Sequence, residues 1–438
     1  MKRIIALLLL IVAAFASASV SYSNAGLKKP NHEKYVACYF QSWAIYRNDQ
    51  GVFQISDINT EHCTHIIYAF AGLNASSWEI QSLDHFADLA DHNGKDGYRE
   101  FTKLRYHYQH IKPILAIGGW NQGSRNYSEM ANDAGRRTIF VRSVVSFLRA
   151  HNFHGLDIDW EYPGTRGGSE HDRANFVRLL KELYYAFKPH KFLLTAAISA
   201  HLDEDSLERR YSLKPMAEYL DYIHVMTYDY HVGNRVVMPN APLDKVNMTI
   251  QILKNTAVPM SKFILGLPTY GRGFILEEPL RSELENPIGK PSRQQSWMGP
   301  YLAQEGFFAY NEICKYLLSE ETWKHRWDNM SYTPYAIYDN RVIVYDDSRS
   351  LHAKIHLAMQ NGFGGVFVWS IDEDDFRGEC IPKHKRDRVN VLDYQYPLMK
   401  AINDALEHDS SASSSFTSSA SAFVLLLLLC FNSLRYSL

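Results

Sequence analysis

Three carboxylate side chains stand at alternate positions between His154 and Gly164: Asp157, Asp159 and Glu161. Successive side chains of an extended strand point to opposite faces, so these three share one face. Converging acids cost free energy unless they are hydrogen bonded, neutralised or used. A solvated edge strand and a cation site are the alternatives, but the apolar second face favours a strand of a buried parallel sheet that carries a chemical site. That second face consists of Leu156, Ile158 and Trp160.

The composition of the chain permits a large folded core. Of its 438 residues, 46% are hydrophobic, and the formal net charge is -2. A chain of this length buries most of its apolar surface on folding. The balanced charge gives no basis for binding a nucleic acid backbone, and we expect no nucleic acid partner.

Eight short apolar runs recur along the chain, separated by helix-like segments. Repetition of strand and helix predicts a parallel sheet. Four of the separating segments carry apolar residues at spacings of three and four, as covering helices do: 135–151, 169–187, 244–256 and 350–360. The fold class is therefore α/β, a (β/α)8 barrel, in which chemistry collects at the C-terminal strand ends. The eight runs are 35–40, 64–72, 112–119, 155–161, 192–199, 222–229, 263–270 and 364–371.

The seventh and eighth runs are separated by about 90 residues, far more than one crossover helix needs. Residues 273–346 are rich in aromatics and contain alternating segments such as 335–338 and 341–345. This pattern predicts a small α+β lobe that walls the mouth of the barrel. We expect the barrel and its lobe together to cover residues 31–408.

Both ends of the chain carry targeting patterns. Residues 1–18 combine a charged start, an apolar run and a small-residue end, as a secretory signal peptide does, and the run is shorter than the roughly 20 residues of a membrane span. Residues 409–421 form a serine-rich spacer, and 422–438 form a short hydrophobic tail. Spacer and tail predict a GPI-attachment signal, with an uncleaved hydrophobic tail as the alternative. We therefore expect a protein of the secretory pathway, held at the outer cell surface by a lipid anchor.

The cysteines fit an oxidising compartment. Without Cys430 of the tail, four remain, and they allow three pairings. Cys38 and Cys63 each begin a β-like run, so adjacent strands would bring them together and leave Cys314 for Cys380. Four N-glycosylation sequons agree with the secretory route. They begin at Asn74, Asn126, Asn247 and Asn329.

Seven sequence blocks between about Tyr35 and Tyr396 stand in a recognisable order. They are CYFQSWAIYR at Cys38, CTHIIYAFAGL at Cys63, ILAIGGWN at Ile114, GLDIDWEYPG at Gly155, YIHVMTYD at Tyr222, LGLPTYGRGF at Leu265 and GGVFVWSIDEDDF at Gly364. With them the chain resembles the family-18 glycoside hydrolases, specifically the secreted animal chitinases and chitinase-like proteins. The resemblance implies a barrel with an α+β insertion after the seventh strand, and endo-type hydrolysis of β-1,4-linked N-acetylglucosamine in chitin or its oligomers.

The resemblance implies a different task for each acid. Glu161 matches the general acid that protonates the glycosidic oxygen, a task for a carboxyl kept protonated by burial and neighbouring charge. Asp159 matches the group that hydrogen-bonds the acetamide N–H of the substrate, and Asp157 would share a proton with it. Tyr228 matches the phenol that hydrogen-bonds the acetamide oxygen. That oxygen is the nucleophile in this family, so configuration is retained without a covalent glycosyl-enzyme.

Other matched positions line the expected sugar cleft. Aromatic rings are platforms for the apolar faces of sugars, and Trp369 matches the floor of the subsite where the sugar is cleaved. An aromatic residue on a strand belongs more often to the core, and Tyr39 and Phe70 stand between these two interpretations. The family match favours a sugar platform for Trp369 and Trp120. The remaining substrate-binding candidates are Trp43, Met226, Asp229, Tyr270 and Arg272.

The chain departs from the family pattern at two places. His154 stands where the fuller signature has an aspartate, and an imidazole there would change the charge acting on Asp157 and hence the pH optimum. The segment from Tyr230 to Asp244 is short and lacks the tryptophan-bearing loop of many relatives. This predicts a more open cleft with one weaker subsite.

Two functions remain open, an active chitinase and a non-catalytic glycan-binding lectin of the same fold. Family members become lectins when they lose the acid, and the presence of Glu161 with Asp159 and Tyr228 favours the enzyme. We expect no metal and no cofactor, because the histidine and cysteine spacings offer no ligand cluster. The expected partners are chitin or chitooligosaccharides, and the expected state is a monomer.

Overall fold

The structure is a computed structural model, and it describes residues 29–200, 207, 209–230, 235–282, 285–318, 322–381 and 390–409. The expected signal peptide, the tail and all of the spacer beyond residue 409 lie outside these residues. Within the described part of the chain, no helix combines the length and the apolar character that a membrane span requires.

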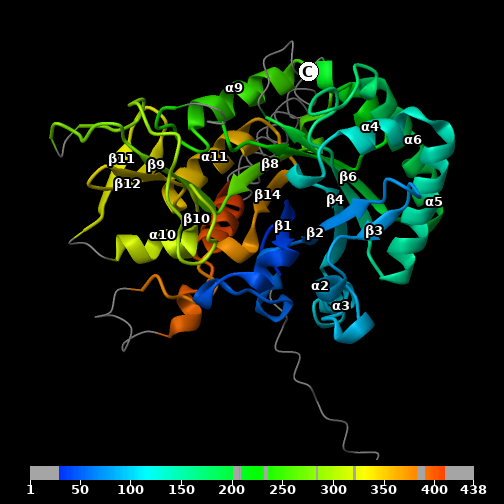
Figure 1. The fold of residues 1–438 in the computed structure, drawn as a ribbon, viewed down its shortest axis with the longest axis horizontal. Helices are drawn as coiled ribbons and strands as arrows, with labels where there is room; N and C mark the ends of the chain where they lie inside the picture. The colour runs from blue at the N-terminus through cyan, green and yellow to red at the C-terminus, as the bar shows by residue number, and fades with distance from the viewer. Residues whose placement is uncertain are drawn as a thin grey trace, which may run out of the picture.

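Eight parallel strands close into a barrel (Figure 1). Strand β1 (Tyr35–Gln41) pairs with β14 (Gly365–Trp369) on one side and with β2 (His65–Leu73) on the other, so the first and last strands close the sheet. A short strand, β3 (Ile80–Ser82), adds to β2 in the antiparallel sense. The eight expected strands are present, and the (β/α)8 class is confirmed. The other five are β4 (Lys112–Gly118), β5 (Gly155–Asp159), β6 (Leu193–Ser199), β7 (Tyr222–Met226) and β8 (Phe263–Pro268).

Helices cover the outside of the barrel. The four amphipathic segments of the sequence form α5 (Ala134–Ala150), α6 (Asp172–Phe187), α9 (Leu243–Lys254) and α11 (Ser348–Gln360). Capping fixes where two of them begin, because the side chains of Asp133 and Asp347 accept hydrogen bonds from the backbone of the first turns of α5 and α11. The others are α2 (His85–Asp88), α3 (Gly97–His107), α4 (Arg125–Asn132), α8 (Leu213–Ala217) and a last described helix over 397–409.

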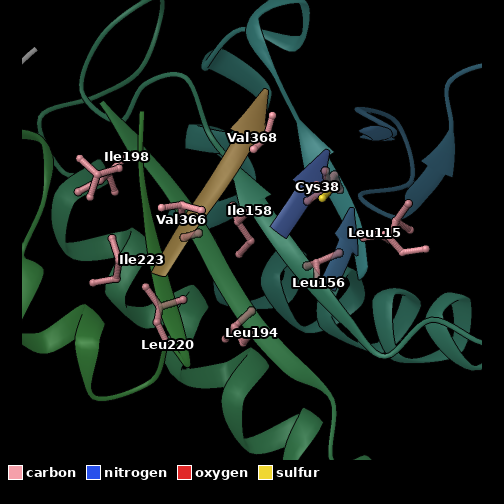
Figure 2. Packing of buried hydrophobic residues seen from close by; sticks show 14 of the residues in the cluster. Cys38, Leu115, Leu156, Ile158, Leu194, Ile198, Leu220, Ile223, Val366 and Val368 are labelled. Atoms are coloured by element: carbon pink, nitrogen blue, oxygen red, sulfur yellow. The ribbon is translucent and has the colours of Figure 1, made fainter. Parts of the chain in front are cut away.

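Alternation along the strands separates two apolar layers. On β5, Leu156 and Ile158 belong to the apolar layer between the strands and the helices, and Leu156 pairs with Leu194 of β6 (Figure 2). Each such side chain stabilises the fold by roughly 1.5–3 kcal/mol when it is fully buried. The opposite face of each strand points into the barrel. The apolar cluster there includes Tyr35, Tyr39, Ile67, Ala116 and Phe367, so the acids of β5 project into a closed interior.

The chain between β8 and β14 forms an α+β lobe, which Figure 1 shows on the side of the barrel opposite α4, α5 and α6. Its antiparallel sheet has the strand order β10-β9-β13-β12-β11 and is accompanied by α10 (Tyr310–Leu317). The run 263–270 is not one strand as expected, because β8 ends at Pro268 and Tyr270 already belongs to the lobe. The strands of the lobe are β9 (Tyr270–Ile275), β10 (Phe307–Ala309), β11 (Lys324–Asp328), β12 (Thr333–Tyr338) and β13 (Arg341–Val344).

Two disulfides tie distant segments together. Cys38 of β1 is bonded to Cys63, which precedes β2, with a Cα–Cα distance of 6.0 Å. Cys314 of α10 is bonded to Cys380, beyond β14, with a Cα–Cα distance of 5.4 Å. The expected pairing is confirmed. Cross-links of this kind stabilise a fold mainly by restricting the unfolded chain.

The four sequon asparagines differ in accessibility. Asn247 and Asn329 are exposed, whereas Asn74 and Asn126 are half-buried. The Oδ1 atom of Asn74 also accepts hydrogen bonds from the backbone of Ser76, at 2.9 Å. Glycosylation at these positions stays a prediction.

Candidate active site

The three acids lie at the C-terminal end of β5. The strand ends at Asp159, and Glu161 follows in the turn. Asp157 and Asp159 are 0% and 5% exposed, whereas Glu161 is half-buried. Gly118, with φ +115°, allows β4 to approach this point, because a Cβ there would lie 2.1 Å from the carbonyl oxygen of Asp159.

The side chains of Ser124, which precedes α4, and of Asp172 in α6 hold the turn that follows β5. The indole nitrogen of Trp160 donates to Ser124 Oγ at 2.6 Å, and Ser124 Oγ donates to the carbonyl oxygen of Tyr162 at 2.9 Å. Buried Asp172 accepts a hydrogen bond from the backbone N–H of Gly164 at 3.0 Å. These buried hydrogen bonds fix the backbone on both sides of Glu161.

Asp157 receives hydrogen bonds from three side chains of three other strands. Tyr39 Oη donates to Oδ2 at 2.7 Å, Thr195 Oγ1 donates to Oδ1 at 2.5 Å, and His224 Nδ1 lies 3.2 Å from Oδ1. Burial alone would raise the pKa of Asp157, but the electrostatic interaction with His224 and the hydrogen bonds from His224, Thr195 and Tyr39 lower it below its usual range. This carboxyl is therefore ionised at neutral pH.

Asp159 differs from Asp157 in lacking such support. Its Oδ1 atom is buried and has no hydrogen-bond partner in the described part of the molecule. Burial, followed by the negative charges of Glu161 and Asp157, raises the pKa of Asp159 well above its usual range. These opposite shifts favour protonation of Asp159 over Asp157, so a proton shared by the pair would reside on Asp159.

Glu161 has the protonation behaviour of a general acid. Burial raises the pKa of Glu161 to about 7, against the opposing effects of a hydrogen bond from Tyr162 and the charge of Arg166. Asp229 adds to the increase through its negative charge. A carboxyl with a pKa near the working pH can both give up and regain a proton during a reaction.

Residues from β7 and β9 form a second wall of the site. Tyr228 is buried, and burial raises its pKa well above its usual range, so the phenol keeps its proton. Asp229 Oδ1 accepts hydrogen bonds from Tyr270 Oη at 2.8 Å and from Arg272 Nε at 3.0 Å. Met226, at the end of β7, is half-buried against the barrel interior.

Aromatic rings gather at the same end of the barrel. Trp369 stacks on Phe70 with ring centroids 5.7 Å apart, and Trp43 of the 3-10 helix η1 (Ser42–Tyr46) lies 6.0 Å from Phe70. Trp43 and Trp120 expose 41% and 54% of their surface. The guanidinium of Arg166 lies 3.6 Å from the centre of the Trp120 ring. Exposed rings in this arrangement can stack on sugar faces.

All expected catalytic and substrate-binding positions therefore lie at one end of the barrel. Tyr39 lies deeper than expected for a substrate contact, because it is 2% exposed and its hydroxyl is bound to Asp157. Its ring centroid is 5.4 Å from that of Trp369, so it supports both the acid and the aromatic group from below.

The expected effect of His154 on Asp157 is wrong. Residues three apart on a strand point to opposite faces, and His154 faces the helix layer, 3.5 Å from Arg105 of α3. Burial, then the charges of Arg105 and Lys112, lower the pKa of His154. The imidazole that contacts Asp157 is His224.

Sequence reasoning missed His224 and Thr195. His224 is fully buried in β7, where its Nδ1 pairs with Tyr39 Oη at 2.8 Å and its Nε2 with Tyr35 Oη at 3.1 Å. The available signal was a polar residue at the centre of the apolar run 222–226, on the same face as Tyr228.

One group of side chains in the described residues has the spacing of metal ligands. It consists of Cys314, Asp375 and Cys380. The two cysteines form a disulfide with each other, so this group offers no thiolate to a metal ion.

Residues 35–374 match the family model "Glycosyl hydrolases family 18", and the chain belongs to this family. A probable chitinase 2 of Drosophila melanogaster is 40% identical over 426 residues, which cover 91% of this chain and 85% of the relative. The Group IV chitinase of Ostrinia furnacalis in complex with allosamidin is 35% identical with a TM-score of 0.78, covering 86% of this chain and 100% of that one. Human YKL-39, a pseudo-chitinase with retained chitooligosaccharide binding, is 28% identical with a TM-score of 0.74, covering 85% and 100%.

Replacing His224 tests what keeps Asp157 ionised. We expect His224→Asn to raise the pKa of Asp157, because the variant loses the electrostatic interaction and the hydrogen bond of the imidazole that oppose the effect of burial. Carboxyl carbon NMR titration measures this shift, with Asp157→Asn assigning the signal. His154→Asn is the matched control and should leave the signal unchanged; equal shifts in both variants would contradict the assignment.

Proposed function

We propose that the chain hydrolyses β-1,4-linked N-acetylglucosamine polymers or oligomers by a substrate-assisted retaining mechanism. The observation that carries this proposal is that the three acids at the end of β5 have different pKa values. Asp157 has a lowered pKa, Asp159 a raised one, and Glu161 a pKa of about 7. A set of neighbouring acids with separated pKa values supports assigned acid and base roles.

In the first step, protonated Glu161 gives its proton to the glycosidic oxygen, and the bond from that oxygen to the anomeric carbon breaks. The acetamide oxygen of the same sugar bonds to the anomeric carbon and forms a cyclic cation. Asp159 passes its proton to Asp157. The ionised Asp159 then accepts a hydrogen bond from the acetamide N–H, where positive charge develops. The Tyr228 hydroxyl orients the acetamide oxygen for attack.

In the second step, ionised Glu161 takes a proton from water, and the water oxygen bonds to the anomeric carbon. The bond between the acetamide oxygen and the anomeric carbon breaks, which opens the cyclic cation and restores the acetamide. The configuration at the anomeric carbon is retained. Trp369, Phe70, Trp43 and Trp120 bind the sugar rings by stacking. Met226, Asp229, Tyr270 and Arg272 contact the sugar from the second wall.

A glycan-binding role without turnover is the second candidate. The likeness to human YKL-39, a pseudo-chitinase that retains chitooligosaccharide binding, supports it. The presence of Glu161 with a raised pKa beside Asp159 and Tyr228 favours the enzyme over this alternative.

Glu161→Gln separates the two roles. We expect the variant to lose hydrolysis of a fluorogenic chitotriose by at least about a thousandfold, because the amide cannot protonate the leaving oxygen. Binding of N-acetylglucosamine oligomers, measured by calorimetry, should stay within a few fold. If the unmodified protein binds the oligomers but shows no turnover, the lectin role stands instead.

The alkaline side of the pH profile should report Glu161. The carboxyl works in the first step only when protonated, so with a pKa of about 7 activity is present at acidic pH and is lost as the pH rises through about 7. Measuring kcat/KM across pH checks this. Arg166→Gln removes a charge that lowers the pKa of Glu161, so it should move the alkaline limb to higher pH. Undiminished activity at a pH of about 9 would contradict the role of Glu161.

We place the enzyme outside the cell, attached by a lipid anchor. The pattern of residues 1–18 supports secretion, and the spacer and tail from 409 to 438 support a GPI anchor. Phosphatidylinositol-specific phospholipase should release the protein from intact cells. Retention after this treatment, with release of a known anchored marker as the control, would argue for an uncleaved tail.

A further inference from the structure

A cavity of about 480 Å³ lies in the lobe beside the second wall of the site. Three arginines line it, namely Arg235, Arg272 and Arg293. Arg272 also pairs with Asp229, which is bound to Tyr270, so a single side chain connects the cavity with the expected sugar contacts. A ligand chain that reaches Asp229 can therefore continue into this cavity.

Backbone hydrogen bonds hold the three arginines close together although they lie far apart in the sequence. The N–H of Ser292 donates to the carbonyl oxygen of Arg235 at 2.9 Å, and the N–H of Arg293 donates to that of Ile275 at 2.8 Å. Ile275 ends β9, the strand that carries Arg272. The fold thus brings three separate segments to one positively charged cavity.

The charge of this cavity is only partly compensated. Arg272 is paired with Asp229, whereas Arg235 donates to the neutral amide of Gln294 at 3.1 Å. Neither Arg235 nor Arg293 has an ion pair within the described residues, and both are exposed. Among the residues that the structure describes, the lining contains one carboxylate, that of Glu305, and its Oε1 accepts a hydrogen bond from the backbone N–H of Ser296 at 2.6 Å. A net positive charge remains for a ligand.

An uncharged N-acetylglucosamine polymer does not require two unpaired guanidinium groups. Guanidinium binds the planar oxygens of carboxylates and the oxygens of sulfate esters through paired, charge-assisted hydrogen bonds. The cavity volume lies within the range of about 300–1,000 Å³ that small-molecule sites occupy, which admits a substituted sugar ring. The same charge repels the ammonium group of a deacetylated glucosamine unit.

We propose that this cavity is a specificity subsite for an anionic substituent, a sulfate ester or a carboxylate, on a glycan chain that extends from the site at Asp229. The inference rests on the proposed function for the identity of the glycan. It assigns the enzyme to acidic or partly sulfated glucosamine-containing polymers in addition to neutral chitin, and it disfavours deacetylated stretches at this position.

Binding of matched oligomers to the Glu161→Gln protein tests the proposal without turnover. We compare a neutral N-acetylglucosamine oligomer with equal-length oligomers that carry one O-sulfate, one carboxylate or one deacetylated unit. At low salt, either the sulfated or the carboxylated oligomer should bind about five- to tenfold tighter than the neutral oligomer. The deacetylated oligomer should bind more weakly than the neutral one. The advantage should shrink as salt is added. The sulfate and carboxylate arms show which anion fits.

The double variant Arg235→Gln, Arg293→Gln should bring the anionic oligomer to the affinity of the neutral one. The control Arg142→Gln, Arg149→Gln makes the same charge change on exposed positions of α5, on the far side of the barrel, and should keep the preference. Equal affinities for anionic and neutral oligomers, or a preference that survives loss of Arg235 and Arg293, would overturn the proposal. Failure of the proposed function is a separate result, the absence of hydrolysis by the unmodified protein.

Discussion

The arrangement of the candidate active site depends on a single buried negative charge, the carboxylate of Asp157. An ion in the interior is costly unless hydrogen bonds and an opposite charge compensate it. Here compensation comes from Tyr39 on β1, Thr195 on β6 and His224 on β7. These donors are 118, 38 and 67 residues away in the sequence, so they meet only after the barrel has closed. Fold and protonation state are therefore acquired together.

The charge of Asp157 in turn orders the other two acids. Burial, followed by the charges of Glu161 and Asp157, raises the pKa of Asp159, and burial raises the pKa of Glu161 to about 7. Three similar side chains at the end of one strand thus acquire three different pKa values through their depth and their neighbours. The glycine at the end of β4 and the buried bonds around Trp160 hold these depths constant.

Periodicity in the sequence predicted what depends on local pattern. The eight strands, the four main helices and the pairing of Cys38 with Cys63 followed from alternation and order. Residue type alone could not reveal contacts across the barrel. For this reason His224 was missed, and the effect of an imidazole on Asp157 was assigned to His154 instead. For Tyr39 the choice between a core residue and a sugar contact stayed open, because only the closed barrel shows its hydroxyl beneath Asp157. The division at Pro268 was hidden because only Thr269 separates the end of β8 from the start of β9.

The disulfide between Cys314 and Cys380 joins α10 of the lobe to the chain beyond β14. The lobe is already attached to the barrel where β8 leads into β9 and where α11 leads back to β14. The disulfide adds a third connection between the lobe and the barrel, and each added connection reduces the motions available to the lobe. The disulfide therefore restricts how far the lobe can move from the strand ends, and a glycan bound as proposed would meet an opening whose width is limited by this link.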